Sequence, residues 1–202
     1  MNPVFHIKEV NINIHAYQRA PALVALGAAF AAAAASPTPD PVESVDIAIP
    51  AHGEYWPGEG GKNGGFVPAR GDVPAHYLIF ASEDLSGKFK WGGREKESAA
   101  ISKTDGRFNT DALLSEGDHP AAEAAAKYTA DGHEDFYLAA PAELYQGWLN
   151  CPDIFSKSDW YWSSSQRSAY SAFTLHFGGG NQHYYGKGNE CFVRPVRRKF
   201  IQ

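Results

Sequence analysis

The residues between Gln166 and Asn189 include many side chains that bind ligands without reacting with them. Tyrosine gives a large contact area at a low cost in conformational entropy, while serine, asparagine and glycine give adaptable hydrogen bonds. This composition predicts a recognition surface; the alternative is an ordinary set of solvated strand and turn residues with half-buried tyrosines. The candidate ligand-binding residues are Gln166, Ser168, Tyr170, Thr174, His176, Asn181, His183, Tyr185 and Asn189.

No sequence motif predicts catalysis or a bound cofactor. The chain lacks a P-loop, a GxGxxG, a GxSxG and an HExxH. Its eight histidines are scattered singly, and its two cysteines, Cys151 and Cys191, form no CxxC motif. We therefore expect no metal, no cofactor and no enzymatic activity. The cysteines either pair with each other or lie in the core as small hydrophobic residues.

The overall charge argues against nucleic acid as the main partner, because the net charge is -5 and no basic stripe dominates the chain. One local exception lies near the end, where Arg194, Arg197, Arg198 and Lys199 fall within six residues. We interpret this cluster as structural pairing of a terminal strand, with phosphate binding as the alternative.

The elements that must position the candidate residues are strands around a glycine turn. In Ala169–Phe177 the alternating pattern predicts that Phe173, Leu175 and Phe177 face the core. The other side, with Tyr170, Ala172, Thr174 and His176, is then expected to face outward. Glycines 178–180 make the turn, and His183, Tyr185 and Asn189 should be exposed together beside Tyr170 and Thr174. Pro195 is expected to limit the last strand to an edge or a bulge.

The rest of the chain predicts a compact α+β domain at residues 46–202. His76–Phe80 is the clearest strand, and Phe89 and Trp91 lie on one face of a segment expected to pair with it in a hairpin. Two helices are expected: one begins near Pro120, and the other runs from Pro141 to Cys151. Glu143, early in the second helix, is expected to be a capping residue or a partner of the helix dipole, and not an acid catalyst. Trp160 and Trp162 are expected in the core.

Residues 1–45 are expected to form an N-terminal arm. Ala20–Ala35 is rich in alanine, the residue with the best helix propensity, and predicts a docking or oligomerisation helix. It also has the character of a secretory signal, although the preceding nineteen residues are long and mixed. The run is shorter than the roughly 20 apolar residues that span a bilayer, so we expect no membrane insertion. Three prolines in Ser36–Glu43 predict a stiff linker.

Residues Tyr161–Arg198 resemble the C-terminal domain of bacterial collagen-like adhesins and of many phage and prophage proteins. The shared features are a W-S-S-[ST] opening, an aromatic strand, a G-x-Q turn, a lysine and a terminal V-R-[PC]-V-R. They correspond to Trp162–Ser165, Phe173–Phe177, Gly180–Gln182, Lys187 and Val193–Arg197. Upstream, "DFYLAAPAELYQGWLN" resembles the family's helix entry, and "GEYWPGEGGKNGGFVPARGD" resembles the start of the phage-encoded members. The similarity covers about residues 50–198.

This resemblance implies a C-type-lectin-like fold with short antiparallel strands and two helices. The fold also occurs in formylglycine-generating enzymes and in the variable proteins of diversity-generating retroelements. Formylglycine chemistry would need a cysteine pair poised for copper or thiol chemistry, which the positions of Cys151 and Cys191 do not suggest. The candidate ligand-binding residues have largely the composition that adenine-directed diversification produces.

The function that the resemblance implies is a structural protein of a phage or prophage virion, in a tail, fibre or surface component, that binds a host. Its expected partners are other virion proteins, contacted through residues 1–45, and a host-surface protein or glycan. A homo-oligomer is also expected. Two alternatives remain: a decoration or assembly protein of the virion that binds no receptor, and a secreted bacterial adhesin released by cleavage after Ala35.

Overall fold

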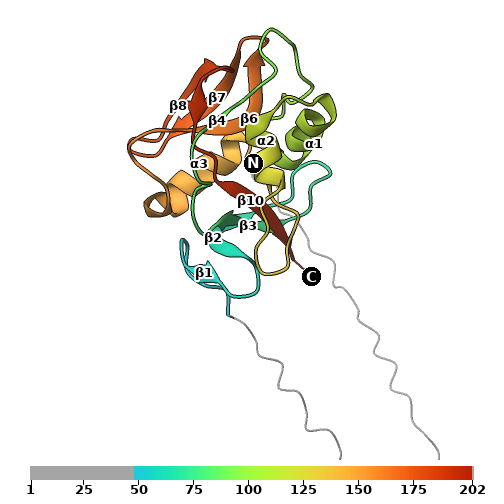
Figure 1. The fold of residues 1–202 in the computed structure, drawn as a ribbon. Coiled ribbons are helices and arrows are strands. Elements are labelled where there is room, and N and C mark those ends of the chain that lie inside the picture. Colours follow the sequence, from blue (N-terminus) through green and yellow to red (C-terminus); the bar gives the residue numbers. More distant parts are fainter. Residues whose placement is uncertain (1–47, 202) are drawn as a thin grey trace, which may run out of the picture. The chain divides into compact units, whose positions relative to one another are not determined.

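The computed structural model describes residues 48–201, all of them within one compact unit, Asp46–Gln202. The predictions for the arm, the alanine-rich helix and the proline linker lie outside the described residues. The described part contains ten strands, three α-helices and one short 3-10 helix, η1 (Pro152–Ile154), and all its sheets are antiparallel. This arrangement confirms the α+β class (Figure 1).

The largest sheet joins the beginning of the domain to its end. Its five strands lie in the order β1 (Tyr55–Trp56), β2 (Gly61–Val67), β3 (His76–Ala81), β10 (Pro195–Phe200) and β5 (Tyr137–Leu138). Strand β3 confirms the predicted strand at His76–Phe80. The expectation that Pro195 limits the last strand to an edge or a bulge is wrong, because β10 pairs with β3 on one side and β5 on the other. Pro195 is the first residue of β10, a position at which a strand tolerates the missing N–H.

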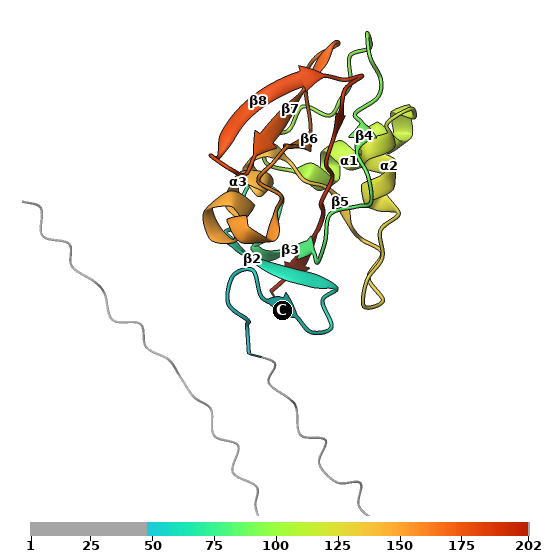
Figure 2. The ribbon, with the colours of Figure 1, turned by 60° about the vertical axis from the view of Figure 1, so that its left-hand side comes forward.

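The late strands form a second sheet, called here the hairpin sheet, of β6 (Trp160–Ser168), β7 (Ser171–His176) and β8 (Asn181–Gly186). Figure 2 shows β8 as its outer strand. A two-stranded ladder joins β4 (Phe89–Lys90) to β9 (Glu190–Cys191). The segment with Phe89 therefore pairs with the end of the chain and not with the neighbouring strand in sequence.

Three helices occur where two were expected: α1 (Gly106–Glu116), α2 (Pro120–Ala126) and α3 (Pro141–Asn150). Helix α3 confirms the second prediction, and Glu143 caps it by accepting a hydrogen bond from Ala140 N at 2.7 Å. Helix α1 was not predicted as a separate helix because it begins with glycine and carries asparagine and threonine, which are poor helix formers. Its N-terminus is fixed instead by Asp105, whose side chain accepts from Phe108 N at 3.0 Å.

The hairpin sheet has a hydrophobic cluster on each of its faces. Tyr161 and Leu175 pack with Phe80 in one cluster, whereas Trp162 and Ala172 belong to the other. The second cluster also contains Trp91, Leu113, Cys191 and Val193. The expectation that both tryptophans of β6 lie in the core is confirmed for Trp162, but Trp160 is only half-buried.

The basic cluster of the last strand is structural, as expected. Arg194 Nε donates to Asp84 Oδ1 at 2.7 Å, and Arg197 Nε donates to Asp135 Oδ1 at 2.7 Å. The other two cations also pair with carboxylates, in the pairs Arg198–Asp105, Arg198–Glu143 and Lys199–Glu59. These interactions join β10 to distant parts of the domain, which accounts for the cluster without a phosphate ligand.

Cys151 and Cys191 are free and buried. Of the two predicted alternatives, the structure therefore shows the second: the cysteines do not pair but lie in the core as small hydrophobic residues. Burial raises the pKa of Cys151 to about 11 and that of Cys191 to about 12. Because the thiolate is the reactive form, each should react at least roughly a hundredfold more slowly than free cysteine with a disulfide reagent at about pH 8. Absorbance of the released thiol, with and without denaturant, measures this; rapid labelling of the native protein would contradict it.

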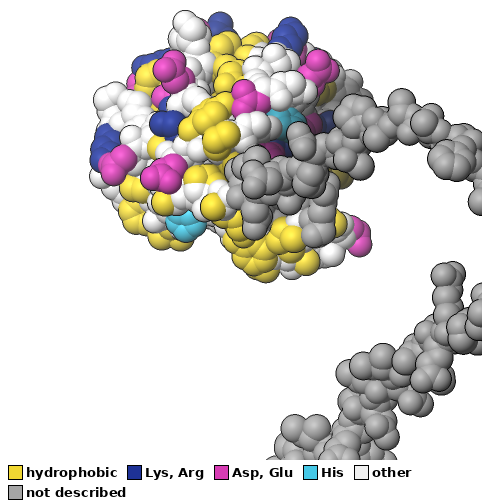
Figure 3. Space-filling model, turned by 90° about the horizontal axis from the view of Figure 1, so that it is seen from below, with side chains coloured by type: hydrophobic (Ala, Val, Ile, Leu, Met, Phe, Trp, Pro, Cys, Tyr) yellow, Lys and Arg dark blue, Asp and Glu magenta, His cyan; other side chains and the backbone are white. Residues whose placement is uncertain are grey.

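The lower end of the domain, seen in Figure 3, carries interspersed hydrophobic, acidic and basic side chains. None of the described helices combines the length and the hydropathy that a membrane-spanning helix needs.

Candidate ligand-binding groove

A groove of about 660 Å³ lies at the tip of the hairpin sheet. Three segments surround it: the β6–β7 turn, the β8–β9 turn and the loop that contains Arg94. We call it the hairpin groove, and its lining residues are Arg94, Arg167, Ser168, Tyr170, Ser171, Tyr184, Tyr185, Gly186, Gly188 and Asn189. Four of the nine candidate residues thus come together here: Ser168, Tyr170, Tyr185 and Asn189.

Backbone hydrogen bonds fasten the walls of the hairpin groove to one another. Lys187 N donates to Tyr170 O at 2.9 Å and joins the two turns. Glu95 N donates to Ala169 O at 2.9 Å and joins the loop of Arg94 to the β6–β7 turn. Asn189 N closes its own turn on Gly186 O at 2.9 Å. The groove is therefore preformed, and a ligand would not have to order these segments on binding.

A buried lysine supports the groove from below. Lys187 has no exposed surface, and its Nζ donates to Lys96 O at 2.8 Å, Gln166 Oε1 at 3.0 Å and Gly93 O at 3.3 Å. Its Nζ also lies 4.6 Å from the centroid of the Trp91 ring. Burial lowers the pKa of this amine, because the charged form loses its water. Lys187 thus joins the loop of Arg94 to β6.

The prediction that Gln166 is exposed is wrong. The residue is 6 % exposed, and its side-chain amide is fully engaged. Its Oε1 accepts from Ser98 N and Lys187 Nζ, and its Nε2 donates to Glu97 Oε2 at 2.6 Å and to Ser98 O at 2.9 Å. Gln166 therefore supports the groove and has no polar group left for a ligand.

The outward orientation expected for Ala172 and Thr174 is also wrong, because Ala172 is fully buried and Thr174 is 2 % exposed. Alternation predicts one wet face only when the other face alone packs on the core, whereas here both faces of the hairpin sheet are covered. On the face expected to be buried, Phe173 is half-exposed, with Lys103 Nζ 4.0 Å from its ring centroid.

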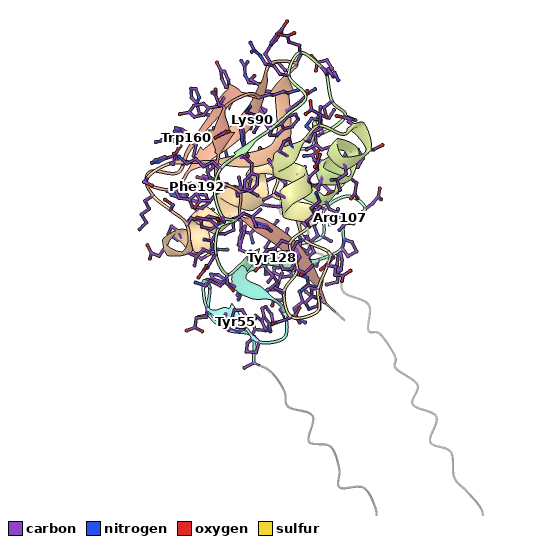
Figure 4. The ribbon with its side chains drawn as sticks, in the orientation of Figure 1. Tyr55, Lys90, Arg107, Tyr128, Trp160 and Phe192 are labelled. Carbon is purple, nitrogen blue, oxygen red and sulfur yellow. The ribbon has the colours of Figure 1, made fainter. Side chains whose placement is uncertain are left out.

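Three further candidate residues lie outside the hairpin groove. His176 and His183 surround Trp160, with ring centroids 5.2 Å and 5.8 Å from the indole ring. Tyr185 reaches the same indole at 5.2 Å and so borders both this cluster and the groove. Figure 4 shows Trp160 at the hairpin sheet, far from Tyr55 and Tyr128 at the lower end. Asn181 is exposed at the start of β8.

The prediction that His183, Tyr185 and Asn189 are exposed together beside Tyr170 and Thr174 is therefore confirmed only in part. Tyr170, His183 and Asn189 are exposed, Tyr185 is half-buried and Thr174 is buried. His183 lines a smaller hollow of about 290 Å³ together with Phe173, Gln182 and Tyr184, and of these four residues only Tyr184 also lines the hairpin groove.

Six groove residues were not among the predicted ones: Arg94, Arg167, Ser171, Tyr184, Gly186 and Gly188. Arg167 lies with its Cζ 3.8 Å from the centroid of the Tyr184 ring, so the two side chains form one stacked wall. Arg167 stands between the candidate residues Gln166 and Ser168, and this position in the sequence is a signal for its place in the site. Arg94 comes from a distant segment, and no local sequence pattern places it here.

The fold and the site together define an α+β domain that presents a preformed polar groove at the tip of a three-stranded sheet. No three His, Cys, Asp or Glu side chains gather as a metal site would need in the described range, residues 48–201. Compared with models of protein families and with curated proteins, the chain has no match.

Proposed function

We propose that this chain is a virion protein of a phage or prophage, in a tail, fibre or surface component, and that its C-type-lectin-like domain binds a host surface. The observation that carries the proposal is the hairpin groove. Tyrosine, serine, glycine and asparagine make up most of its lining, and its walls are held by backbone hydrogen bonds. Rigid aromatic anchors combined with small polar residues are the composition of adaptable binding sites.

The residues that carry the family resemblance support this proposal by their positions. Trp162, Lys187 and Arg194 are all buried and hold the hairpin sheet and its surroundings together. The groove residues instead lie on the surface of that scaffold. A fixed scaffold with a chemically adaptable surface is what the lectin-like proteins of phages and of diversity-generating retroelements lead us to expect.

The proposal includes two partners. A host-surface protein or glycan binds in the hairpin groove, and other virion proteins bind residues 1–45, which lie outside the described residues. A homo-oligomer assembled through the same arm is part of the proposal. The chain is not proposed to act as an enzyme or to bind nucleic acid.

Filling the groove tests the binding half of the proposal. A Cβ atom added at Gly188 meets no atom within 4 Å, so Gly188→Trp should fold and occupy the groove. We expect the fluorescently labelled full chain to bind intact cells of at least one strain in a panel of bacteria. The variant should lose at least about 90 % of that signal in flow cytometry, because the indole excludes the ligand.

Lys127→Trp is the matched control, since Lys127 is exposed at the C-terminal cap of α2 and does not line the groove. Its binding should equal that of the unchanged chain. Binding that persists in Gly188→Trp would reject the groove, and failure to bind any strain would favour a decoration or assembly protein. Mass spectrometry of purified particles tests the virion assignment, and recovery from the medium of a chain that begins at Ser36 would favour the secreted adhesin.

A further inference from the structure

We propose that the hairpin groove selects an acidic glycan, and that Arg94 and Arg167 bind the carboxylate of its sugar. This inference rests on the proposed function, because it requires that the groove binds a ligand, but it goes further by giving the chemical class of that ligand.

The charge of the groove lining has one sign. Arg94 and Arg167 contribute the only formal charges among its ten residues, none of which is Asp or Glu. Neither arginine forms an ion pair with a carboxylate in the part of the chain that the structure describes, whereas Arg194, Arg197 and Arg198 all do. The planar guanidinium matches a carboxylate with two parallel hydrogen bonds, so two unpaired arginines in one groove suit an anion.

The acidic side chain behind the groove does not cancel this charge. Glu97 lies beyond the β6–β7 turn and does not line the groove. Its Oε1 accepts from Ala169 N at 3.1 Å and its Oε2 accepts from Gln166 Nε2 at 2.6 Å. Glu97 lies close enough to the buried ammonium of Lys187 for its negative charge to raise the pKa of Lys187. Burial lowers that pKa and is the larger effect. Glu97 is thus engaged by the Gln166 amide and the Ala169 backbone, and it forms no ion pair with either arginine of the groove.

The aromatic residues of the groove favour a sugar ring. Tyr170 is 58 % exposed and Tyr184 is 41 % exposed, so both rings present a face or an edge to a ligand. Arg167 already stacks on Tyr184, which holds the guanidinium in place before binding. A carbohydrate combines apolar C–H faces with hydroxyl groups, and tyrosine rings with amide and hydroxyl side chains complement both. The volume of about 660 Å³ lies in the range of small-ligand sites.

A pair of substitutions that differ only in charge tests the inference. Gly188 lines the groove, has open space at its Cβ position and does not have a positive φ. Gly188→Asn and Gly188→Asp therefore place side chains of the same size in the groove, one neutral and one anionic. The full chain and both variants are titrated onto immobilised glycans ending in N-acetylneuraminic acid or glucuronic acid, onto the neutral glycans lacking those sugars, and onto a sugar phosphate.

We expect the unchanged chain to bind the carboxylate-bearing glycans in preference to their neutral counterparts. Gly188→Asp should bind them at least about tenfold more weakly than Gly188→Asn, because the new carboxylate competes for the arginines. Arg94→Gln should weaken binding by a similar factor. Raising the salt concentration should reduce the affinity, as screening does for exposed charges. Equal melting temperatures of the two Gly188 variants would show that folding is not the cause.

Several outcomes would overturn the inference while leaving the proposed function intact. They are equal binding by the Asn and Asp variants, preference for neutral glycans, binding of the sugar phosphate alone, and cell binding that depends on the groove but is blocked only by an acidic peptide. Failure of the chain to bind any cell, in contrast, rejects the proposed function itself. The two experiments therefore fail in distinguishable ways.

Discussion

Replacing Lys187 with methionine is expected to lower the free energy of unfolding by about 3 kcal/mol, because buried acceptors lose their donor. Methionine keeps the length of the side chain and its contact with Trp91, but it cannot donate to Lys96 O, Gln166 Oε1 or Gly93 O. Each buried acceptor left without a partner costs roughly 1–3 kcal/mol, less where a water enters. Chemical denaturation followed by tryptophan fluorescence measures the change.

The position of Lys187 predicts a second effect of the same substitution. The amine joins the loop of Arg94 to β6, so this wall of the hairpin groove should loosen before the whole domain unfolds. Hydrogen exchange at residues 93–98 should become faster than in the five-stranded sheet. Lys127→Met is the control, because Lys127 is exposed and its pair with Glu123 spans 3.9 Å; its effect should stay within about 0.5 kcal/mol. Equal stabilities of the two variants would show that Lys187 does not support the groove.

Replacing Arg198 with methionine is expected to lower the free energy of unfolding by about 4 kcal/mol, because it leaves a buried carboxylate without its cation. Glu143 is 4 % exposed, and Arg198 Nη2 donates to its Oε1 at 3.0 Å and to Asp105 Oδ1 at 2.8 Å. Tyr137 donates to the same Glu143 oxygen at 2.9 Å. Both carboxylates also cap helices, so the loss should affect the starts of α1 and α3.

The pH dependence of this variant follows from the pKa of Glu143. Burial raises that pKa, and the charge of Arg198 acts against the rise. Without Arg198 the pKa rises further, so the folded variant takes up a proton at a pH where the unfolded chain does not. A state that binds more protons gains stability as the pH falls. The difference in the free energy of unfolding between the unchanged chain and Arg198→Met should therefore become smaller as the pH falls from about 7 to about 5.

A double substitution separates the ion pair from the packing of Arg198. Glu143→Gln removes the charge and keeps one side-chain oxygen, which can still accept from Ala140 N, while the new NH2 group can donate to the hydroxyl oxygen of Tyr137. Arg198→Met with Glu143→Gln should be more stable at about pH 7 than Arg198→Met alone, because no buried charge remains unpaired. Arg107→Met serves as the exposed control, since the side chain of Arg107 is 46 % exposed. If the double variant is no more stable than the single one, the unpaired carboxylate is not the cause.

Local sequence patterns predicted those helices and strands in which all neighbouring residues favour the same secondary structure. Strand β3 and helix α3 were found because five or more neighbouring residues favour the same structure and proline marks the start of the helix. Helix α1 has no such agreement, since its stability comes from the Asp105 cap and the burial of Leu113. The position of β10 inside its sheet was not predictable from Pro195, because strand order depends on pairing with β3 and β5.

The residues of the candidate site, like the helices and strands, were predicted only in part. The tips of β6 to β8 were correctly indicated as a concentration of tyrosine and small polar residues, and Tyr170 and Asn189 line the groove. Gln166 and Thr174 were misplaced because the sequence does not reveal that both faces of a strand will be covered. Arg94 was missed because the segment that carries it is brought to the groove by the bond from Glu95 N to Ala169 O.

Local sequence patterns were enough to predict the α+β class, the strand at His76, the helix at Pro141 and the chemical character of the late strands. These properties depend on neighbouring residues, through propensity, alternation and capping. The packing of distant segments sets which of those polar side chains share a groove, which lie buried beneath it and which arginines join them. Those outcomes depend on contacts between segments far apart in the chain, such as Lys187 with Gly93, and a local pattern carries no information about them.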